Sequence, residues 1–133
     1  MTLPAGARVR ATRAFAASQQ AVLGFMRAQD PDTAQARYEA LLQELQGVVQ
    51  RLAWAPGSGR PARFLDAASV QGQSLALRAR QLADTLGAPH LREAVLRRHL
   101  LLYAHGDSEV FLLALKHERQ LAYALPAGAG PVR

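Results

Sequence analysis

A group of hydrogen-bond donors is expected to meet at one corner of a predicted β-hairpin. A turn centred near Asp107 would bring the start of the strand at Leu100 opposite the end of the strand at Leu115. That hairpin gathers five side chains that we call the basic corner: Arg97, Arg98, Lys116, His117 and Arg119. Like charges facing each other across a sheet repel, so their grouping predicts an anionic partner, either a phosphate backbone or the carboxylates of a protein ligand. The alternative is that Glu93 and Glu118 neutralise part of the charge and that solvent screens the rest.

Further candidates lie in the tail and in the central loop. Tyr123 could stack on a base or polarise a phosphate, or it could close the end of the core. Arg60 and Arg63, in the run GSGRPAR, could bind phosphate, but the run lacks the Lys-Ser/Thr pair of a phosphate-binding loop. Trp54 is expected to cover an edge of the core, and Tyr103 to pack in the middle of a strand.

The four histidines do not predict a metal site. All of them, His90, His99, His105 and His117, lie in the last third of the chain. His99 and His105 are six residues apart on one strand, which separates them by ~20 Å at ~3.3 Å per residue, so they cannot bind one ion. We expect them to face solvent or to be hydrogen-bonded within the sheet.

Composition limits the class of protein. The chain has 133 residues, 16 Lys plus Arg against 10 Asp plus Glu, and a net charge of +6. All but one of the cations are Arg, which favours planar contacts with carboxylates and phosphates. Cysteine is absent, which excludes disulfides and thiolate chemistry, and no apolar run approaches the ~20 residues of a membrane helix. We expect one cytoplasmic domain over residues 1–133, with loose tails at 1–6 and 126–133, no cofactor and no membrane partner.

Hydrophobic periodicity predicts an α+β fold. A strand is expected over 7–15, a helix from Ser18 to about Gln29, and a second helix from Asp32 or Thr33 to Ala55. After a loop at 57–63, a third helix is expected over 73–86. Three strands at 91–98, 99–105 and 109–116 then form an antiparallel meander. The runs HLLLYAH and EVFLLALK are apolar on both faces, so these two strands should be central and covered on both sides.

Several strings in this order resemble the RelE/ParE family, the plasmid-stabilisation type of toxin from bacterial type II toxin–antitoxin systems. They are VRATRAFAAS, AQARYEALLQELQGVVQRLAWAP, GRPAR and LREAVLRRHLLLYAHGDSEVFLLALKHERQLAY, and together they span about residues 8 to 123. The last is the most specific, since Leu91-Arg92-Glu93, Leu102-Tyr103 and His117-Glu118-Arg119 match the family's sheet and tail in order.

The resemblance implies a protein that poisons its own cell when free and is neutralised by a cognate antitoxin. The antitoxin would cover the sheet and the basic corner, and the pair would bind promoter DNA only through the antitoxin. Some members of the family cleave mRNA on the ribosome, and others inhibit DNA gyrase without cutting anything. For the nuclease branch the resemblance implies four catalytic residues: Arg98, His117, Arg119 and Tyr123. For binding of nucleic acid or target it implies Arg92, Arg97, Arg98, Lys116 and Arg119.

Two departures from the family pattern keep other functions open. Leu100 stands where the mRNA-cleaving members carry an arginine, in a pattern like YRxxY, which weakens the nuclease branch. The helix expected over 73–86 is extra, and its leucines would either enlarge the core or shape a groove for the antitoxin. The chain could instead be a non-catalytic basic module that binds nucleic acid or a partner helix, or an inactive member of the family.

Overall fold

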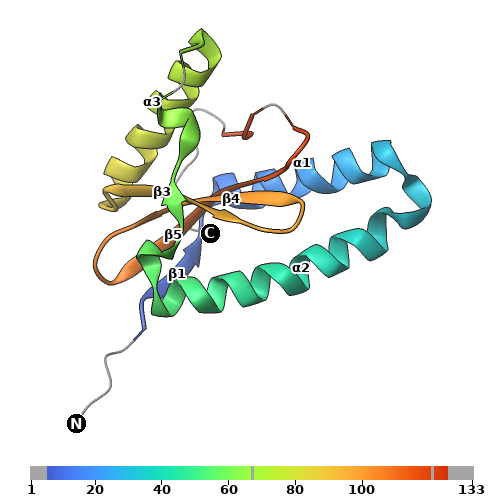
Figure 1. The fold of residues 1–133 in the computed structure, drawn as a ribbon, viewed down its shortest axis with the longest axis horizontal. Coiled ribbons are helices and arrows are strands. Elements are labelled where there is room, and N and C mark those ends of the chain that lie inside the picture. Colours follow the sequence, from blue (N-terminus) through green and yellow to red (C-terminus); the bar gives the residue numbers. More distant parts are fainter. Residues whose placement is uncertain (1–5, 67, 121, 126–133) are drawn as a thin grey trace.

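The computed structural model describes residues 6–66, 68–120 and 122–125, and it has the expected α+β composition (Figure 1). The predicted loose tails lie outside these residues, except for Gly6. The strands are β1 (Arg8–Ala11), β2 (Arg60–Pro61), β3 (His90–Val95), β4 (His99–His105) and β5 (Glu109–His117). The helices are α1 (Arg13–Gln29), α2 (Pro31–Trp54) and α3 (Val70–Leu86), with short 3-10 turns η1 (Pro56–Ser58) and η2 (Arg63–Asp66). No described helix is long and apolar enough to cross a membrane.

The five strands form one sheet in the order β1-β5-β4-β3-β2. The first strand pairs in parallel with the last, Arg8 opposite Glu109, and the other neighbours are antiparallel. β5 and β4 occupy central positions, which confirms the expectation drawn from their apolar faces. The meander was predicted correctly, and the predicted turn at 106–108 separates β4 from β5.

Helices cover both faces of the sheet. On one face, α3 packs through Leu75, Ala79 and Leu82 against alternate strand residues such as Leu102 and Phe111. On the other face, the hairpin of α1 and α2 packs against the intervening strand residues, among them Leu101, Tyr103 and Leu112. Figure 1 shows α3 on the opposite side of the sheet from the long α1–α2 hairpin. We call these two sides the α3 face and the hairpin face.

A β-bulge in β5 changes which residues lie on each face. Leu102 pairs with Ala114 and Tyr103 pairs with Leu112, so Leu113 has no partner on β4. Leu113 and Ala114 therefore both pack on the α3 face, and Leu115 returns to the hairpin face. An extra residue in one strand reverses the alternation of side chains beyond it.

The first helix begins earlier than its sequence predicts. α1 starts at Arg13, where the sequence indicated a strand that continues to Phe15 and a cap at Ser18. Thr12 is the N-cap instead: its fully buried hydroxyl accepts the N–H of Phe15 at 3.2 Å and donates to the carbonyl of Leu112 at 2.8 Å. Ser18 lies inside the helix and accepts the N–H of Leu115 at 2.8 Å. The side-chain hydroxyl of either residue could cap a helix, and the pairing of β1 with β5 makes Thr12 the N-cap.

Other boundaries also differ from the prediction. β3 ends at Val95, so Arg97 and Arg98 belong to the turn that follows rather than to a strand. The loop expected at 57–63 contains the two-residue strand β2, and α3 begins three residues early because Ser69 caps it. The prediction that Trp54 covers the core is wrong, since its side chain is 71% exposed. Leu75 and Leu82 of α3 are buried, which favours enlargement of the core as the role of this helix.

Candidate functional site: a basic corner on the hairpin face

The turn between β3 and β4 holds two arginines next to the end of β5. His99 pairs with His117 in the sheet, and the N–H of Glu118 donates to the carbonyl of Arg98 at 2.8 Å. The predicted hairpin register is therefore close to the observed one. Arg98 forms an ion pair with Glu118 at 3.7 Å, and both side chains remain largely exposed, at 71% and 47%. Such surface pairs contribute little, so the Arg98 guanidinium remains available to a ligand.

The structure divides the predicted basic corner between the two faces of the sheet. Because of the bulge, His117 lies on the hairpin face and Lys116 lies on the α3 face. Arg97, Arg98 and Arg119 are exposed beside His117. From here on, "hairpin-face corner" means the four residues Arg97, Arg98, His117 and Arg119.

His117 is held as a neutral hydrogen-bond donor. Its Nδ1 accepts the backbone N–H of Arg119 at 3.1 Å, so the neutral ring carries its proton on Nε2. Burial lowers the pKa of His117, and the nearby charges of Arg119, Arg98 and Arg37 lower it further, against an opposing effect of Glu118. The ring packs against Phe25, with 5.1 Å between centroids. The corner thus offers guanidinium groups and an imidazole N–H, all of them donors suited to phosphate oxygens.

Two adjoining hollows give a ligand access to this corner. They have volumes of about 310 and 340 Å³, and both are lined by Arg37, Arg98 and His117. Arg37 of α2 was not a candidate from the sequence, and each of its three side-chain nitrogens already donates a hydrogen bond, the shortest to the carbonyl of Met26 at 2.9 Å. It is thus a structural tie between α1 and α2. Glu44 accepts the backbone N–H of Arg97 at 2.7 Å and adds one negative charge to the rim.

His99 is buried beneath the corner without a partner for one nitrogen. Only 5% of the residue is exposed, and its Nε2 has no hydrogen bond to any residue that the structure describes. Its ring meets that of His117 edge-on, with 4.9 Å between centroids. Burial, and then the charge of His117, lower the pKa of His99 to about 4. The sequence predicted that His99 and His105 face solvent or are hydrogen-bonded. The prediction is wrong for Nε2 of His99, and it is correct for His105, whose two ring nitrogens are hydrogen-bonded.

We expect His99 to make the protein less stable in mild acid. The unfolded chain binds a proton near the ordinary pKa of 6.5, whereas the folded chain does not until pH about 4. The free energy of unfolding should therefore fall between these values, by about 3 kcal/mol at most. Urea unfolding at pH 7, 6, 5 and 4.5 measures the slope. His99→Leu should flatten it and the exposed control His90→Leu should not; equal slopes in both variants would contradict the assignment.

Tyr123 and Lys116 lie on the α3 face, away from His117. The Tyr123 hydroxyl donates to the buried Glu93 carboxylate at 2.5 Å, and only 6% of the residue is exposed. Burial, followed by the hydrogen bond to Glu93, raises the pKa of Tyr123. Glu93 pairs there with Arg60 and does not neutralise the hairpin-face corner; of the two glutamates weighed from the sequence, only Glu118 contacts it.

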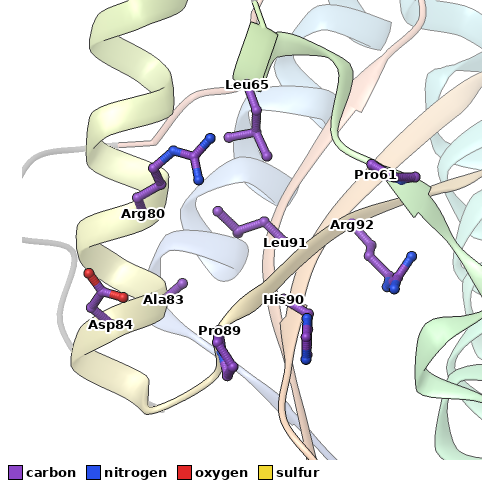
Figure 2. A pocket seen from close by; sticks show the side chains of 9 residues that line it. All are labelled: Pro61, Leu65, Arg80, Ala83, Asp84, Pro89, His90, Leu91 and Arg92. Carbon is purple, nitrogen blue, oxygen red and sulfur yellow. The ribbon is translucent and has the colours of Figure 1, made fainter.

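Arg92 lies apart from both groups, towards the edge of the sheet. Its Nε donates to His105 Nε2 at 3.0 Å, and another nitrogen donates to the carbonyl of Gly59 at 3.1 Å. A hollow of about 430 Å³ lies at this edge of the sheet. In Figure 2, Leu91 points towards α3, while His90 and Arg92 extend to the other side of β3. Arg92 therefore holds the central loop onto the sheet.

Among the described residues, no cluster of three or more His, Asp or Glu side chains could hold a metal ion.

Comparison with known proteins does not identify the chain. No protein-family model matches the sequence, and no curated protein matches it either. Inference about function therefore rests on the resemblance of the sequence strings and on the geometry of the corner.

Proposed function

We propose that this protein is the toxin of a type II toxin–antitoxin module of the RelE/ParE type, and that it engages RNA phosphates at the hairpin-face corner. The observation that carries the proposal is that the exposed side chains of Arg98 and Arg119 line the same hollow as His117, whose neutral ring carries its proton on Nε2. Three donors around one hollow suit the non-bridging oxygens of a phosphodiester.

In the nuclease branch, these donors would act by stabilising charge. Attack of a ribose 2′-hydroxyl on the adjacent phosphorus forms a 2′,3′-cyclic phosphate and breaks the bond to the 5′-oxygen, with water taking the 2′ proton and supplying one to the 5′-oxygen. The step concentrates negative charge on the phosphate oxygens. Arg98 and Arg119 would stabilise that charge, and His117 would donate a hydrogen bond from Nε2. In this proposal Tyr123 has a structural role, since its hydroxyl is bound to Glu93.

Inhibition of gyrase is the second candidate, and two observations favour it. Nδ1 of His117, the nitrogen that could accept a proton, is occupied by the N–H of Arg119. Leu100, in the position of the family's catalytic arginine, lines a cavity on the α3 face. A toxin that only binds its target needs the exposed cations of the corner and no general base.

The partner in either branch would be an antitoxin with an acidic, extended segment. Since Lys116 and the hairpin-face corner lie on opposite faces, a segment that covers both would have to pass over the end of β5. Charge reversal at Arg97, Arg98, Lys116 and Arg119 should then abolish complex formation, and an unchanged complex would rule this contact out.

The test is tightly induced expression in bacteria, with 5′ RNA ends and gyrase-dependent DNA breaks measured in the same culture. We expect growth arrest with new, translation-dependent 5′ ends inside coding regions. The double variant Arg98→Gln, Arg119→Gln should grow normally, whereas the control Arg8→Gln, opposite Glu109 at the far end of β5, should arrest growth. DNA breaks with unchanged transcripts would establish the gyrase branch instead. Normal growth on expression of the unaltered chain would overturn the proposal.

A further inference from the structure

A separate cavity of about 620 Å³ lies on the α3 face, between the sheet and the start of α3. It is larger than the hollows at the corner and at the sheet edge. Its polar wall comes from three segments far apart in the sequence: Arg60 and Arg63 around β2, Glu93 on β3, and Lys116 on β5. A volume of this size is typical of pockets that hold small organic ligands.

The charges on the cavity wall are suited to an anion. Three cations face one carboxylate, and both oxygens of that carboxylate are already engaged. Glu93 Oε1 accepts the backbone N–H of Arg63 at 2.9 Å, and Oε2 accepts the Tyr123 hydroxyl. Arg60 Nε forms an ion pair with Glu93 Oε1 at 3.6 Å, too far for a hydrogen bond, and among the described residues this buried nitrogen has no hydrogen-bond acceptor. Because Glu93 does not accept a hydrogen bond from Arg60, the guanidinium can donate from its other nitrogens to a ligand oxygen in the cavity.

Lys116 and the first turn of α3 add to the positive potential. The ammonium of Lys116 is held by the carbonyl of Gln120 at 2.8 Å, 5.9 Å from the centre of the Tyr123 ring. Ser69, Gln71 and Gly72, at the amino end of α3, form part of the wall. Free N–H groups at the start of a helix favour negative charge nearby.

The rest of the wall is apolar and largely aromatic. Phe64 and Tyr123 meet edge to face, with 5.7 Å between ring centroids, and Leu75 and Leu100 complete this side. A free inorganic anion would contact the cations and leave the apolar wall in contact with water. A ligand with an anionic head and a flat apolar body would contact both the cations and the apolar wall.

We propose that this cavity binds a small phosphate monoester with a flat apolar body, its phosphate on Arg60, Arg63 and Lys116 and its body against Phe64 and Tyr123. The site is on the opposite face of the sheet from the hairpin-face corner and is independent of the function proposed there. Arg60 and Arg63 were noted in the sequence only as an incomplete phosphate loop; the fold completes their site with residues from β3, β5 and α3.

The test is calorimetric titration of the full chain with phenyl phosphate, inorganic phosphate, benzoate and phenol. Phenyl phosphate should bind at one site, at least about tenfold more tightly than inorganic phosphate, benzoate or phenol, because only it fills both walls. Arg60→Gln and Arg63→Gln should each weaken phenyl phosphate binding about tenfold or more, and Arg8→Gln should leave it unchanged. Equal affinity for benzoate would instead show that the site takes carboxylates and would overturn the phosphate assignment.

Other outcomes also bear directly on the site. Absence of saturable binding to phenyl phosphate would overturn the proposal, as would equal losses in Arg8→Gln. Loss of binding in the double variant Arg98→Gln, Arg119→Gln would move the ligand to the hairpin-face corner and would also overturn it. Thermal unfolding of each variant without ligand shows that it is folded. Growth arrest by the Arg60→Gln variant would leave the toxin proposal intact whatever the titration shows.

Discussion

Replacing Gly59 with alanine is expected to destabilise the protein by about 3 kcal/mol. A β-carbon at Gly59 would lie 2.5 Å from the Tyr103 hydroxyl oxygen and 2.7 Å from the carbonyl oxygen of Glu93. Neither neighbour can move easily, because Tyr103 is fully buried and Glu93 belongs to the sheet. The Tyr103 hydroxyl also accepts the N–H of Gly59 at 2.9 Å and donates to the carbonyl of Pro56 at 2.6 Å. The substitution therefore adds a clash and breaks the contacts that fix the central loop.

The same chain provides a matched control for this substitution. A β-carbon added at Gly47, within α2, would meet nothing within 4 Å. Gly47→Ala should stabilise the protein by up to about 1 kcal/mol, because alanine favours the helix. Urea unfolding of both variants measures the difference. If the free energy of unfolding of Gly59→Ala is within about 1 kcal/mol of that of the unaltered protein, the loop does not approach Tyr103 as closely as described.

Replacing Glu93 with alanine is also expected to lower the free energy of unfolding by about 3 kcal/mol. The carboxylate is 3% exposed and is the common partner of the Arg63 N–H, the Tyr123 hydroxyl and the Arg60 guanidinium. Its loss leaves the Arg63 N–H and the Tyr123 hydroxyl without this acceptor and the Arg60 charge without its counter-ion. Removing one member of a buried ion pair is costly because the other charge remains.

An exposed ion pair of the same length provides the control. Arg10 and Glu109 are also 3.6 Å apart, but both side chains are 40% exposed. Glu109→Ala should cost less than about 1 kcal/mol. The two ion pairs match in residue types and distance, and they differ in burial and in the two hydrogen bonds that Glu93 also accepts. Equal losses in the two variants, measured by urea unfolding at pH 7, would mean that Glu93 is not the buried centre of this network.

The sequence predicts the centre of the fold better than its details. Continuous apolar runs identify β4 and β5 as central strands because residues with both faces buried leave no room for polar alternation. The start of α1 could not be predicted in the same way. Thr12 and Ser18 are equally good caps, and the choice depends on the pairing of β1 with a strand at the other end of the chain.

The sequence predicted which residues of the candidate site lie near one another, but it did not predict on which face of the sheet each of them lies. The turn at 106–108 correctly brings Arg98 near His117. Which of Lys116 and His117 faces the α1–α2 hairpin depends on the unpaired residue Leu113, and one leucine among several carries no sign of a bulge. The cavity on the α3 face could not be predicted from spacing, because its cations come from segments that only the folded sheet brings together.

The parallel pairing of the first strand with the last also determines when each part of the sheet can fold during synthesis. β1 leaves the ribosome early, but its partner β5 follows only after roughly 100 further residues have been synthesised. At about 5–20 residues per second, β1 waits several seconds or more without its partner. The residues of the hairpin-face corner are joined to the end of β5 and to the turn before β4, so they assemble last. A chain that has not yet reached β5 therefore lacks the hairpin-face corner, and any activity at that corner can begin only after β5 has paired with β4.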